Sequence, residues 1–539
     1  GLAARIHSPL LEYEEIELDR ARRVGSLRPS GFVRLGYVDE VDGSVQFCRA
    51  YLPADYSNAQ RWPLVLSLHG YNPENPPLHR WWSIDQRHSD IADRKNVIYI
   101  EPHGRGNAQY IGIGERDVLR CLQEAKARFA VDDDRVYLTG ESMGGHGTWA
   151  ISSRNPHLFA AAAPVFGGWD FRVSTVRGPA LPENQPSNAL EFYIQERRSS
   201  FANAENLLNV PLLVIHGDSD AAVSVENSRH ATQMLQRWGY HIRYWEMPGW
   251  GHEELHQRLA VVDWLLEHRR NSAPRRVRLR SADLSGARAH WLEARAMEEP
   301  QRIIRAEAEV VRPGLVRIDS ENLAAFDLAL PESLRGPTQK LDLVWNGKSQ
   351  RVRLDNGVAR IGTKPGNAHA LLKRPGFEGP IPDIITTPFM VVVGTTSRDP
   401  HMRRIIEERA RDLQDVWMAW QYQPLRLKRD VEVSADDERA YSLILLGGAD
   451  ANAVTRRLGK RLPMSVSGNS IEVDGKRWQV ADAVLQMIYP SPGSDNRYVL
   501  VVAATSATGM HFWKPEFVEP SVGIGFVTSA WTITDGRRP

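Results

Sequence analysis

A serine flanked by glycines stands between a predicted strand and a predicted helix. Gly140-Glu141-Ser142-Met143-Gly144 has the spacing G-x-S-x-G; it follows the apolar run at 135–140 and precedes a helical pattern at 143–154. A serine on a sharp strand-to-helix turn exposes its hydroxyl at the sheet edge, and the flanking glycines allow backbone segments to approach closely. The five-residue pattern is weak by itself, but in this context it predicts that Ser142 is a nucleophile.

A serine nucleophile needs a base and a carboxylate that orients the base, and both follow in the chain. The predicted strand at 210–217 leads to Asp218 and Asp220, and the strand at 241–247 leads through a Gly-rich turn to His252. Asp220 is preferred as the acid because it occupies the Asp position of the turn pattern HGxxDxxV, whereas Asp218 is expected to shape the turn. Ser142, Asp220 and His252 are thus predicted to form a catalytic triad.

An oxyanion formed at the attacked carbonyl needs hydrogen-bond donors close to the nucleophile. The backbone N–H of Met143, directly after Ser142, is the first candidate. The second is the N–H of Tyr71, which follows the strand predicted at 63–70. This chemistry requires no metal ion and no cofactor, and the sequence has no CxxC metal motif.

Several residues near these positions are candidates for binding a substrate. Glu141 adjoins the nucleophile, Trp82 (with Trp81) follows the oxyanion strand, Trp169 follows the strand at 160–168, and Trp250 precedes His252 by two positions. Flat aromatic rings beside such a site would suit a sugar or an aromatic acyl group. The alternative is that half or more of these tryptophans pack in the core or in a lid.

Four other features have a structural interpretation beside a functional one. His146 is expected to pack on a helix face, and Asp117 to cap or pair within its own helix. Arg105, after the strand at 96–102, would border the cleft or form a structural ion pair. The pair Gly447-Gly448 could hold an anion at a strand-to-helix turn, although close backbone packing is favoured.

The elements around the triad alternate between strands and helices. Buried-strand runs are predicted at 63–70, 96–102, 135–140, 160–168, 210–217 and 241–247, with helical patterns near 115–130, 143–154, 224–238 and 253–269. This alternation predicts an α/β fold with a mostly parallel sheet and helices on both faces. Asp42-Gly43, between the alternating runs of residues 31–53, predicts an antiparallel hairpin at one edge of the sheet.

The pattern changes after the segment Asn271-Ser272-Ala273-Pro274. We expect a catalytic domain at 1–270, with a charged helix at 11–23, then a β-sandwich at 275–365, where no helix is evident. A Pro- and Gly-rich connector leads to a smaller α/β domain at 385–539. Its function is not readable from the sequence.

Composition narrows the class of protein. The chain has 539 residues, of which 42% are hydrophobic, and 67 basic residues balance 66 acidic ones. This argues against a protein that coats nucleic acid or an anionic membrane. No apolar run of the length of a membrane span occurs. Cys48 and Cys121 allow one disulfide at most. The N-terminus does not read as a signal peptide, and a trimmed, exported protein is the expectation.

The stretch VDDDRVYLTGESMGGHGTWAISSRNPHLFAAAAPVFGG (131–168), the HGxxD turn at 216–220 and the GWGH segment at 249–252 carry a family resemblance. They resemble the α/β-hydrolase esterases related to prolyl oligopeptidase and to feruloyl and acetylxylan esterases, over about residues 31–270. The resemblance implies an α/β-hydrolase fold with Ser142 as nucleophile, Asp220 as orienting acid and His252 as base. The two trailing domains resemble extensions of unassigned function on bacterial esterases.

Prolyl oligopeptidases place a β-propeller before the catalytic domain. Here the catalytic part comes first and no four-stranded blade repeats follow, which favours an esterase open to larger substrates. The leading hypothesis is a serine carboxylic ester hydrolase acting on acyl or feruloyl esters of polysaccharides. A serine peptidase for small peptides and a non-catalytic binding protein are the alternatives. The trailing domains are expected to orient the enzyme on a polymer or on a neighbouring subunit.

Overall fold

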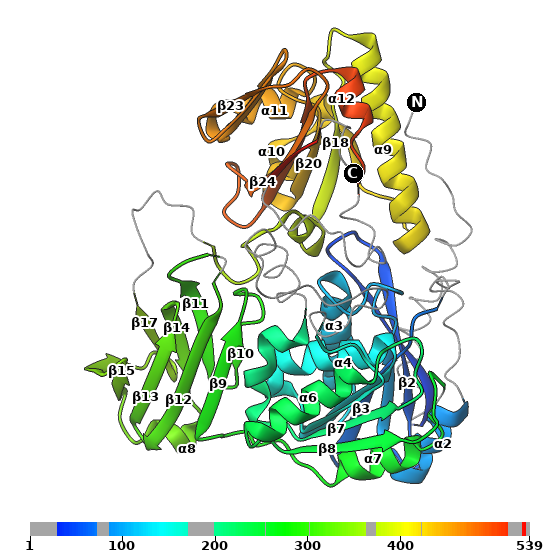
Figure 1. Ribbon diagram of the computed structural model, residues 1–539, viewed down its shortest axis with the longest axis vertical. Helices are drawn as coiled ribbons and strands as arrows, with labels where there is room; N and C mark the ends of the chain where they lie inside the picture. Colours follow the sequence, from blue (N-terminus) through cyan, green and yellow to red (C-terminus); the bar gives the residue numbers. More distant parts are fainter. Residues whose placement is uncertain are drawn as a thin grey trace. The chain divides into compact units, whose positions relative to one another are not determined.

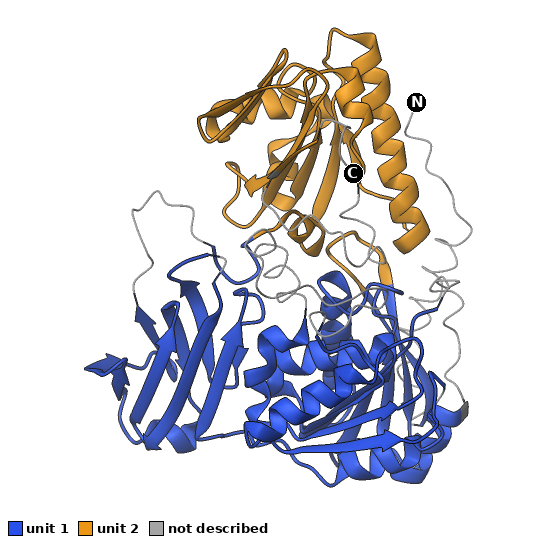
Figure 2. Cartoon of the chain, viewed as in Figure 1, with its two compact units in different colours: residues 1–37, 46–378 blue, residues 38–45, 379–539 orange. Residues whose placement is uncertain are grey.

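The computed structural model describes residues 30–72, 86–170, 199–253, 255–300, 302–362, 373–421, 423–515 and 531–534. They form two compact units (Figure 2). The first comprises the chain up to Tyr37 and residues 46–378, and the second comprises Val38–Val45 and the chain from Gly379 onward. The predicted helix at 11–23, Trp81 and Trp82 lie outside the described residues.

The first unit contains an eight-stranded sheet in the order β1-β2-β4-β3-β5-β6-β7-β8. Figure 1 labels β2, β3, β7 and β8 of this sheet. Its strands are β1 (Gly31–Val38), β2 (Val45–Leu52), β3 (Trp62–Leu68), β4 (Ile98–Pro102), β5 (Val131–Glu141), β6 (Ala161–Val165), β7 (Leu212–Gly217) and β8 (Ile242–Met247). The neighbours from β4 to β8 pair in parallel, and β2 pairs antiparallel with β4. The predicted mostly parallel sheet with an antiparallel edge is therefore confirmed.

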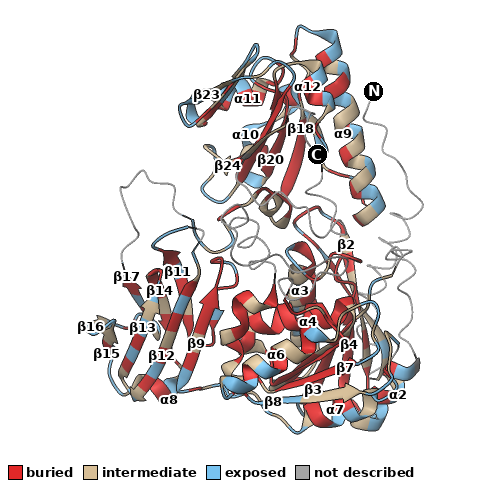
Figure 3. Ribbon diagram, viewed as in Figure 1, coloured by how far each residue is buried: buried red, intermediate tan, exposed pale blue. Residues whose placement is uncertain are grey.

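Helices cover both faces of this sheet. One face packs on α2 (Gln86–Lys95) and α7 (Arg258–Leu266), and the other on α3 (Ile113–Arg128), α4 (Met143–Arg154) and α6 (Glu226–Arg237). Every residue of β4, β6 and β7 is consequently buried (Figure 3). A strand covered on both faces reads as a continuous apolar run, which is why the sequence located these strands closely.

The elements that escaped prediction include α2 and the 3-10 segment η4 (Ser200–Asn209). α2 is strongly polar, and of its side chains only Ile91 and Ala92 add to the hydrophobic core. η4 follows a stretch outside the described residues. Neither has the sustained apolar stripe from which helices are predicted.

The β-sandwich follows in the same unit. Its sheets have the orders β10-β11-β14-β17 and β16-β15-β13-β12-β9, and they enclose one apolar core. The strands are β9 (Arg276–Ser281), β10 (Arg288–Ala289), β11 (Leu292–Met297), β12 (Ile304–Arg312), β13 (Leu315–Glu321), β14 (Leu323–Ala329), β15 (Lys340–Trp345), β16 (Lys348–Arg353) and β17 (Val358–Gly362). The predicted sandwich is confirmed, although it includes one short helix, α8 (Glu332–Arg335), that was not expected.

Buried polar contacts join the sandwich to the hydrolase sheet and its helices. Arg154, at the end of α4, pairs with Glu115 at 3.0 Å and reaches Asp283 of the sandwich at 3.4 Å. Asn206 Oδ1 accepts a hydrogen bond of 2.7 Å from the backbone N–H of Arg280 in β9. Because these groups are withdrawn from water, the bonds specify how the two parts dock.

The second unit is a smaller α/β structure, as predicted. Its main sheet has the order β19-β18-β20-β25-β24-β26, with a three-stranded sheet β21-β22-β23 beside it. Its strands are β18 (Phe389–Val393), β19 (Leu427–Arg429), β20 (Ser442–Leu446), β21 (Met464–Ser467), β22 (Ser470–Val473), β23 (Lys476–Gln479), β24 (Val484–Pro490), β25 (Tyr498–Ala504) and β26 (Trp531–Thr534). Its helices are α9 (Pro400–Gln421), α10 (Ala435–Ala440), α11 (Ala453–Leu458) and α12 (Ala507–His511).

The second unit shows how the Gly447-Gly448 turn packs and where the turn of the N-terminal hairpin lies. A β-carbon at Gly447 would stand 3.1 Å from Ala451 Cβ and 3.2 Å from Ile406 Cδ1, which fits the close-packing interpretation. The turn of the N-terminal hairpin belongs here too, since the backbone N–H of Phe389 donates to the carbonyl of Val41 at 3.2 Å. This bond joins the hairpin turn, Val38–Val45, to the first residue of β18 within the second unit.

Cys48 and Cys121 form a disulfide between β2 and α3. Their Cα atoms are 6.0 Å apart, they are separated by 73 residues, and neither side chain is exposed. A cross-link that closes a loop of this length restricts the unfolded chain substantially.

Replacing both cysteines with alanine is expected to lower the free energy of unfolding by about 4 kcal/mol. Thermal unfolding of the variant and of the wild type, each with and without reductant, checks this. Reductant should lower the midpoint of the wild type and leave that of the variant unchanged. Identical midpoints for the oxidised wild type and the variant would contradict the prediction.

Candidate active site

The three predicted triad residues meet at one edge of the sheet. Ser142 follows β5, Asp220 follows β7 and His252 follows β8. His252 Nε2 lies 2.8 Å from Ser142 Oγ, and His252 Nδ1 lies 2.7 Å from Asp220 Oδ2. With the imidazole protonated at Nδ1, that N–H donates to the carboxylate and the serine hydroxyl donates to Nε2. This is the connectivity that activates a serine for attack.

The turn that presents Ser142 is strained and tightly enclosed. Ser142 has φ of 59° and directly precedes α4. A β-carbon at Gly144 would stand 2.1 Å from the carbonyl oxygen of Leu68, and one at Gly145 would stand 2.3 Å from that of Val165. Only glycine fits at these two positions, and the turn therefore packs directly against β3 and β6.

Asp220 is held as a charged carboxylate. Its side chain is fully buried; Oδ1 accepts hydrogen bonds of 2.8 Å from the backbone N–H groups of Ala222 and Val223, and His216 Nε2 lies 3.3 Å from Oδ2. Burial alone would raise the pKa of Asp220. Hydrogen bonds from His216, His252 and the two N–H groups outweigh it, so the pKa lies well below its ordinary value.

His216 is a supporting residue to which sequence reasoning assigned no role. Its imidazole is buried, with Nδ1 2.7 Å from the hydroxyl oxygen of Ser228 and Nε2 3.0 Å from the carbonyl oxygen of Val223. It appeared in the sequence only as the first letter of the HGxxD turn. The pattern marked the position, but not the contact with Asp220.

Asp218 is engaged in the turn, as expected. Its Oδ1 accepts a hydrogen bond of 2.7 Å from the backbone N–H of Gly249 and one of 2.9 Å from the hydroxyl of Ser219. The bond from Gly249 ties the loop after β7 to the loop that carries His252.

The loop after β3 lies against the nucleophile. A β-carbon at Gly70 would stand 3.7 Å from Ser142 Cβ, and Tyr71 follows with its side chain half exposed. Tyr110 donates its hydroxyl to the carbonyl of His69 at 3.0 Å, and Asn72 exchanges backbone hydrogen bonds with the Asn107 amide. The loop is thus held beside Ser142, where the N–H of Tyr71 and that of Met143 remain the predicted oxyanion donors.

The tryptophans that were candidates for binding substrate differ in their surroundings. Trp169 is 1% exposed and packs on Trp149 with ring centroids 4.6 Å apart. Its ring thus packs in the core, which fits the packing alternative given for these tryptophans. Trp250 is partly buried against Phe166, whose ring also contacts His252 at 4.8 Å. Trp82 lies outside the described residues.

Three further residues have structural partners. His146 is buried, with Nδ1 3.0 Å from the carbonyl oxygen of Gly168, as expected of a packing residue. Asp117 was expected to pair within its own helix. Instead its carboxylate accepts a hydrogen bond of 2.7 Å from the backbone N–H of Gly104 and another from the Tyr37 hydroxyl. Arg105, the next residue of that loop, has φ of 59° and is buried.

Glu141, a candidate for binding substrate, joins the nucleophile strand to the segment after the base. Its Oε1 accepts a hydrogen bond of 2.7 Å from Arg258 Nε, and its Oε2 one of 3.3 Å from the backbone N–H of Leu255. Leu255 follows His252 by three residues. The carboxylate can therefore fix the distance between nucleophile and base.

Replacing Glu141 with alanine is expected to lower kcat about 10- to 100-fold with little change in KM, because a small displacement of His252 weakens proton transfer. Replacement with glutamine, which keeps an acceptor for Arg258 and Leu255, should recover most of the loss. Steady-state kinetics with p-nitrophenyl acetate measures both constants. An unchanged kcat in the alanine variant would refute the positioning role.

The described residues contain neither a metal-binding cluster nor a helix that could span a membrane. Among them, no group of three or more His, Cys, Asp or Glu side chains is arranged to hold a metal ion. No helix in the described ranges has the length and apolar character needed to cross a membrane.

Part of the chain is similar to known proteins. Residues 82–271 match the model of the Prolyl oligopeptidase family. The bifunctional acetylxylan esterase/xylanase XynS20E of Neocallimastix patriciarum is 25% identical over 222 residues, which are 39% of this chain and 31% of that protein. The family resemblance inferred from the sequence is confirmed.

Human prolyl endopeptidase FAP is 25% identical over 213 residues, 36% of this chain and 27% of that protein. The chain thus spans under a third of the length of these two relatives. Among solved structures, a thermostable esterase has a TM-score of 0.35 and 23% identity, covering 44% of this chain and 64% of its own.

Proposed function

We propose that the protein is a carboxylic ester hydrolase that works through an acyl-enzyme. The observation that carries the proposal is the hydrogen-bonded chain from Ser142 through His252 to Asp220 at the carboxyl ends of three parallel strands. The family match over residues 82–271 supports hydrolysis by a serine nucleophile.

The reaction proceeds in two halves. Ser142 Oγ attacks the ester carbonyl while its proton passes to His252 Nε2. His252 then protonates the departing alkoxide, and the acyl group remains on Ser142. A water molecule gives a proton to His252 and attacks the acyl carbonyl, which releases the acid and returns the proton to Ser142.

The surrounding groups stabilise charge during both halves. Asp220 stays ionised and stabilises the imidazolium that forms on His252. The N–H groups of Met143 and Tyr71 would donate to the oxyanion, and α4 directs its N-terminus at the same point. Since the protein dipoles are fixed in advance, little reorganisation accompanies attack.

We propose acyl or feruloyl esters of polysaccharides as substrates. A β-sandwich and a second α/β unit follow the catalytic sheet. One curated relative is named as an acetylxylan esterase, and another as a prolyl endopeptidase. A serine peptidase acting on small peptides is accordingly the second candidate, since it would use the same triad.

A matched panel separates the candidates. Initial rates are measured with p-nitrophenyl acetate and butyrate, methyl ferulate, acetylated xylan and an aminoacyl p-nitroanilide, with wild type and with Ser142→Ala. Ester cleavage that depends on Ser142, with an inert anilide, supports the esterase. Cleavage of the anilide at a comparable rate would favour the peptidase. Rates independent of Ser142 would exclude both.

For the whole chain we propose a catalytic domain at 1–270, a sandwich at 275–365 and a small α/β domain at 385–539. The latter two would orient the enzyme on a polymer or mediate oligomerisation. We also propose export from the cytoplasm, which the Cys48–Cys121 disulfide supports because such bonds persist in oxidising compartments. Fractionation of the native host tests the location, and recovery with cytoplasmic markers would oppose export.

A further inference from the structure

A polar cavity of about 460 Å³ lies between the sheet and the helices α2 and α7. Its lining comes from the carboxyl-terminal parts of β3, β4 and β5, from β2, and from the facing sides of both helices. Neither the triad nor the proposed oxyanion donors account for it.

The cavity adjoins the nucleophile. Gly140 and Glu141, which directly precede Ser142, form part of its wall, as do Gly70 and Leu255. Gly70 approaches Ser142 closely, since a β-carbon there would stand 3.7 Å from Ser142 Cβ. The wall of the cavity is thus contiguous with the turn that carries Ser142.

Both carboxylates that line the cavity lie beside basic side chains. Glu101 Oε2 lies 3.4 Å from Arg49 Nε and 3.7 Å from His88 Nδ1. On the opposite wall, Arg258 is bonded to Glu141. Each pair presents a donor next to an acceptor, and Arg87 lines the same cavity.

Glu101 and His88 are buried, but one polar atom of each side chain makes no hydrogen bond to a described residue. Glu101 is 6% exposed and His88 9%, and the His88 ring is stacked on Tyr99 with centroids 4.8 Å apart. Within the described part of the chain, neither Glu101 Oε2 nor His88 Nδ1 has a hydrogen-bond partner. Their separation of 3.7 Å is too long for a direct bond. Burial opposes ionisation of Glu101, but His88 and Arg49 hold its pKa below the ordinary value.

We infer that this cavity is a subsite for the sugar ring of an ester substrate, with Glu101 and His88 binding two neighbouring hydroxyls. This rests on the proposed ester hydrolysis at Ser142. One hydroxyl donates to Glu101 Oε2, and another bonds to His88 Nδ1, whose stacking on Tyr99 fixes the ring plane. An apolar ring of the same size would leave these buried polar atoms without bonds, at considerable cost.

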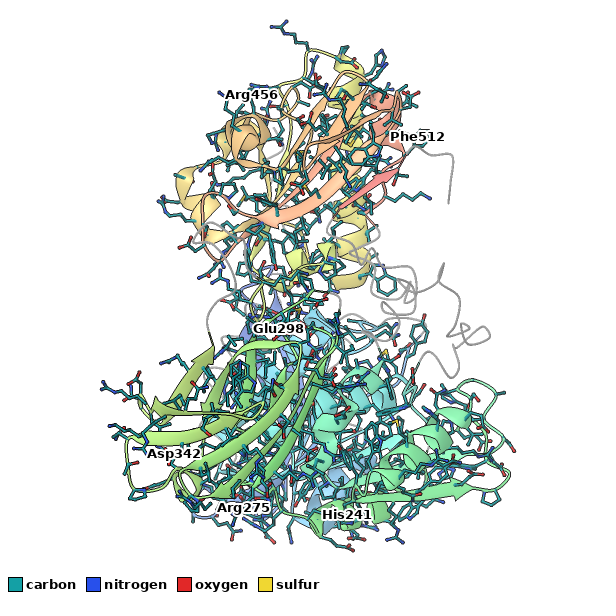
Figure 4. All side chains as sticks on the ribbon, turned by 60° about the vertical axis from the view of Figure 1, so that its left-hand side comes forward. His241, Arg275, Glu298, Asp342, Arg456 and Phe512 are labelled. Carbon is teal, nitrogen blue, oxygen red and sulfur yellow. A yellow bond between two sulfur atoms is a disulfide. The ribbon has the colours of Figure 1, made fainter. Side chains whose placement is uncertain are left out.

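The test compares two acetates that differ in hydroxyls. The probes are a mono-O-acetylated methyl β-xyloside and cyclohexyl acetate, and the measured quantity is the ratio of their kcat/KM values. Glu101→Gln should lower this ratio about 10- to 100-fold, because it removes a charged acceptor. The matched control is Asp342→Asn, which removes a carboxylate paired with Arg351 on the sandwich (Figure 4). It should not alter the ratio.

Binding without turnover provides the second readout. Methyl β-xyloside should raise the thermal midpoint of the wild type and of Asp342→Asn, but not that of Glu101→Gln. His88→Asn, which alters the other partner, should show the same loss and carries the test if Glu101→Gln does not fold.

Different results would exclude the sugar subsite and the proposed ester hydrolysis. If the wild type has equal kcat/KM for both acetates and is not stabilised by the xyloside, the subsite is excluded even where hydrolysis depends on Ser142. If neither acetate is hydrolysed but the xyloside stabilises the wild type through Glu101, the sugar site stands and the esterase proposal fails.

Discussion

Replacing Ser142 with alanine is expected to lower kcat for p-nitrophenyl acetate by about 10⁴- to 10⁶-fold. Ser142 Oγ is the atom that would bond to the acyl carbon, and His252 Nε2 stands 2.8 Å away to receive its proton. Without the hydroxyl no acyl-enzyme forms, and the remaining groups can only assist attack by water. KM should change little, because the alanine side chain fits in the same space.

The variant needs a control and a second readout. Ser349→Ala, on the exposed edge strand β16, removes a hydroxyl far from the triad in sequence and should leave kcat unchanged. A fluorophosphonate probe should label the wild type and Ser349→Ala but not Ser142→Ala. If Ser142→Ala retained more than a tenth of the activity of the wild type, another residue would have to be the nucleophile.

Replacing Asp220 with asparagine is expected to lower kcat about 10⁴-fold. The carboxylate accepts the Nδ1 proton of His252 at 2.7 Å, which leaves Nε2 free to accept the proton of Ser142. An asparagine amide can donate to Nδ1 and thereby stabilise the opposite tautomer, in which Nε2 cannot act as a base. The substitution also removes the negative charge that stabilises the imidazolium form of His252.

The sequence offered two carboxylates after β7, and the comparison of their variants tests the choice. Asp218→Asn should reduce kcat only a few-fold, since Asp218 bonds to Gly249 and Ser219 and acts on the loop. Both variants are compared by kcat with p-nitrophenyl acetate at one pH. A larger loss in Asp218→Asn than in Asp220→Asn would reverse the assignment.

The strands of the large sheet and the helices that cover it could be predicted because the sequence patterns of these elements are local. A strand covered on both faces must be continuously apolar, and an amphipathic helix must repeat near 3.6 residues, whatever the rest of the chain does. The glycines around Ser142 were readable for a similar reason, because a β-carbon there would overlap the backbone of an adjoining strand. The order of Ser142, Asp220 and His252 at strand exits then predicted that they would meet.

Other properties depended on residues far apart in the chain. Trp169 looked like a ring for binding substrate, but packing on Trp149 buries it in the core. Asp117 bonds to the loop at Gly104 rather than within its helix, since the fold places that backbone N–H beside it. Glu141 meets a partner 117 positions later in the chain.

The sequence by itself therefore determined which residues could do the chemistry, the main elements that carry them and their order at the sheet edge. Tertiary structure alone decided which polar groups were already engaged and which remained available. His216 supports Asp220, and Glu101 and His88 share a cavity beside the nucleophile. Such contacts arise from how strands and helices pack against one another. The hydrophobic periodicity of a segment does not identify the residues of other segments that it will contact.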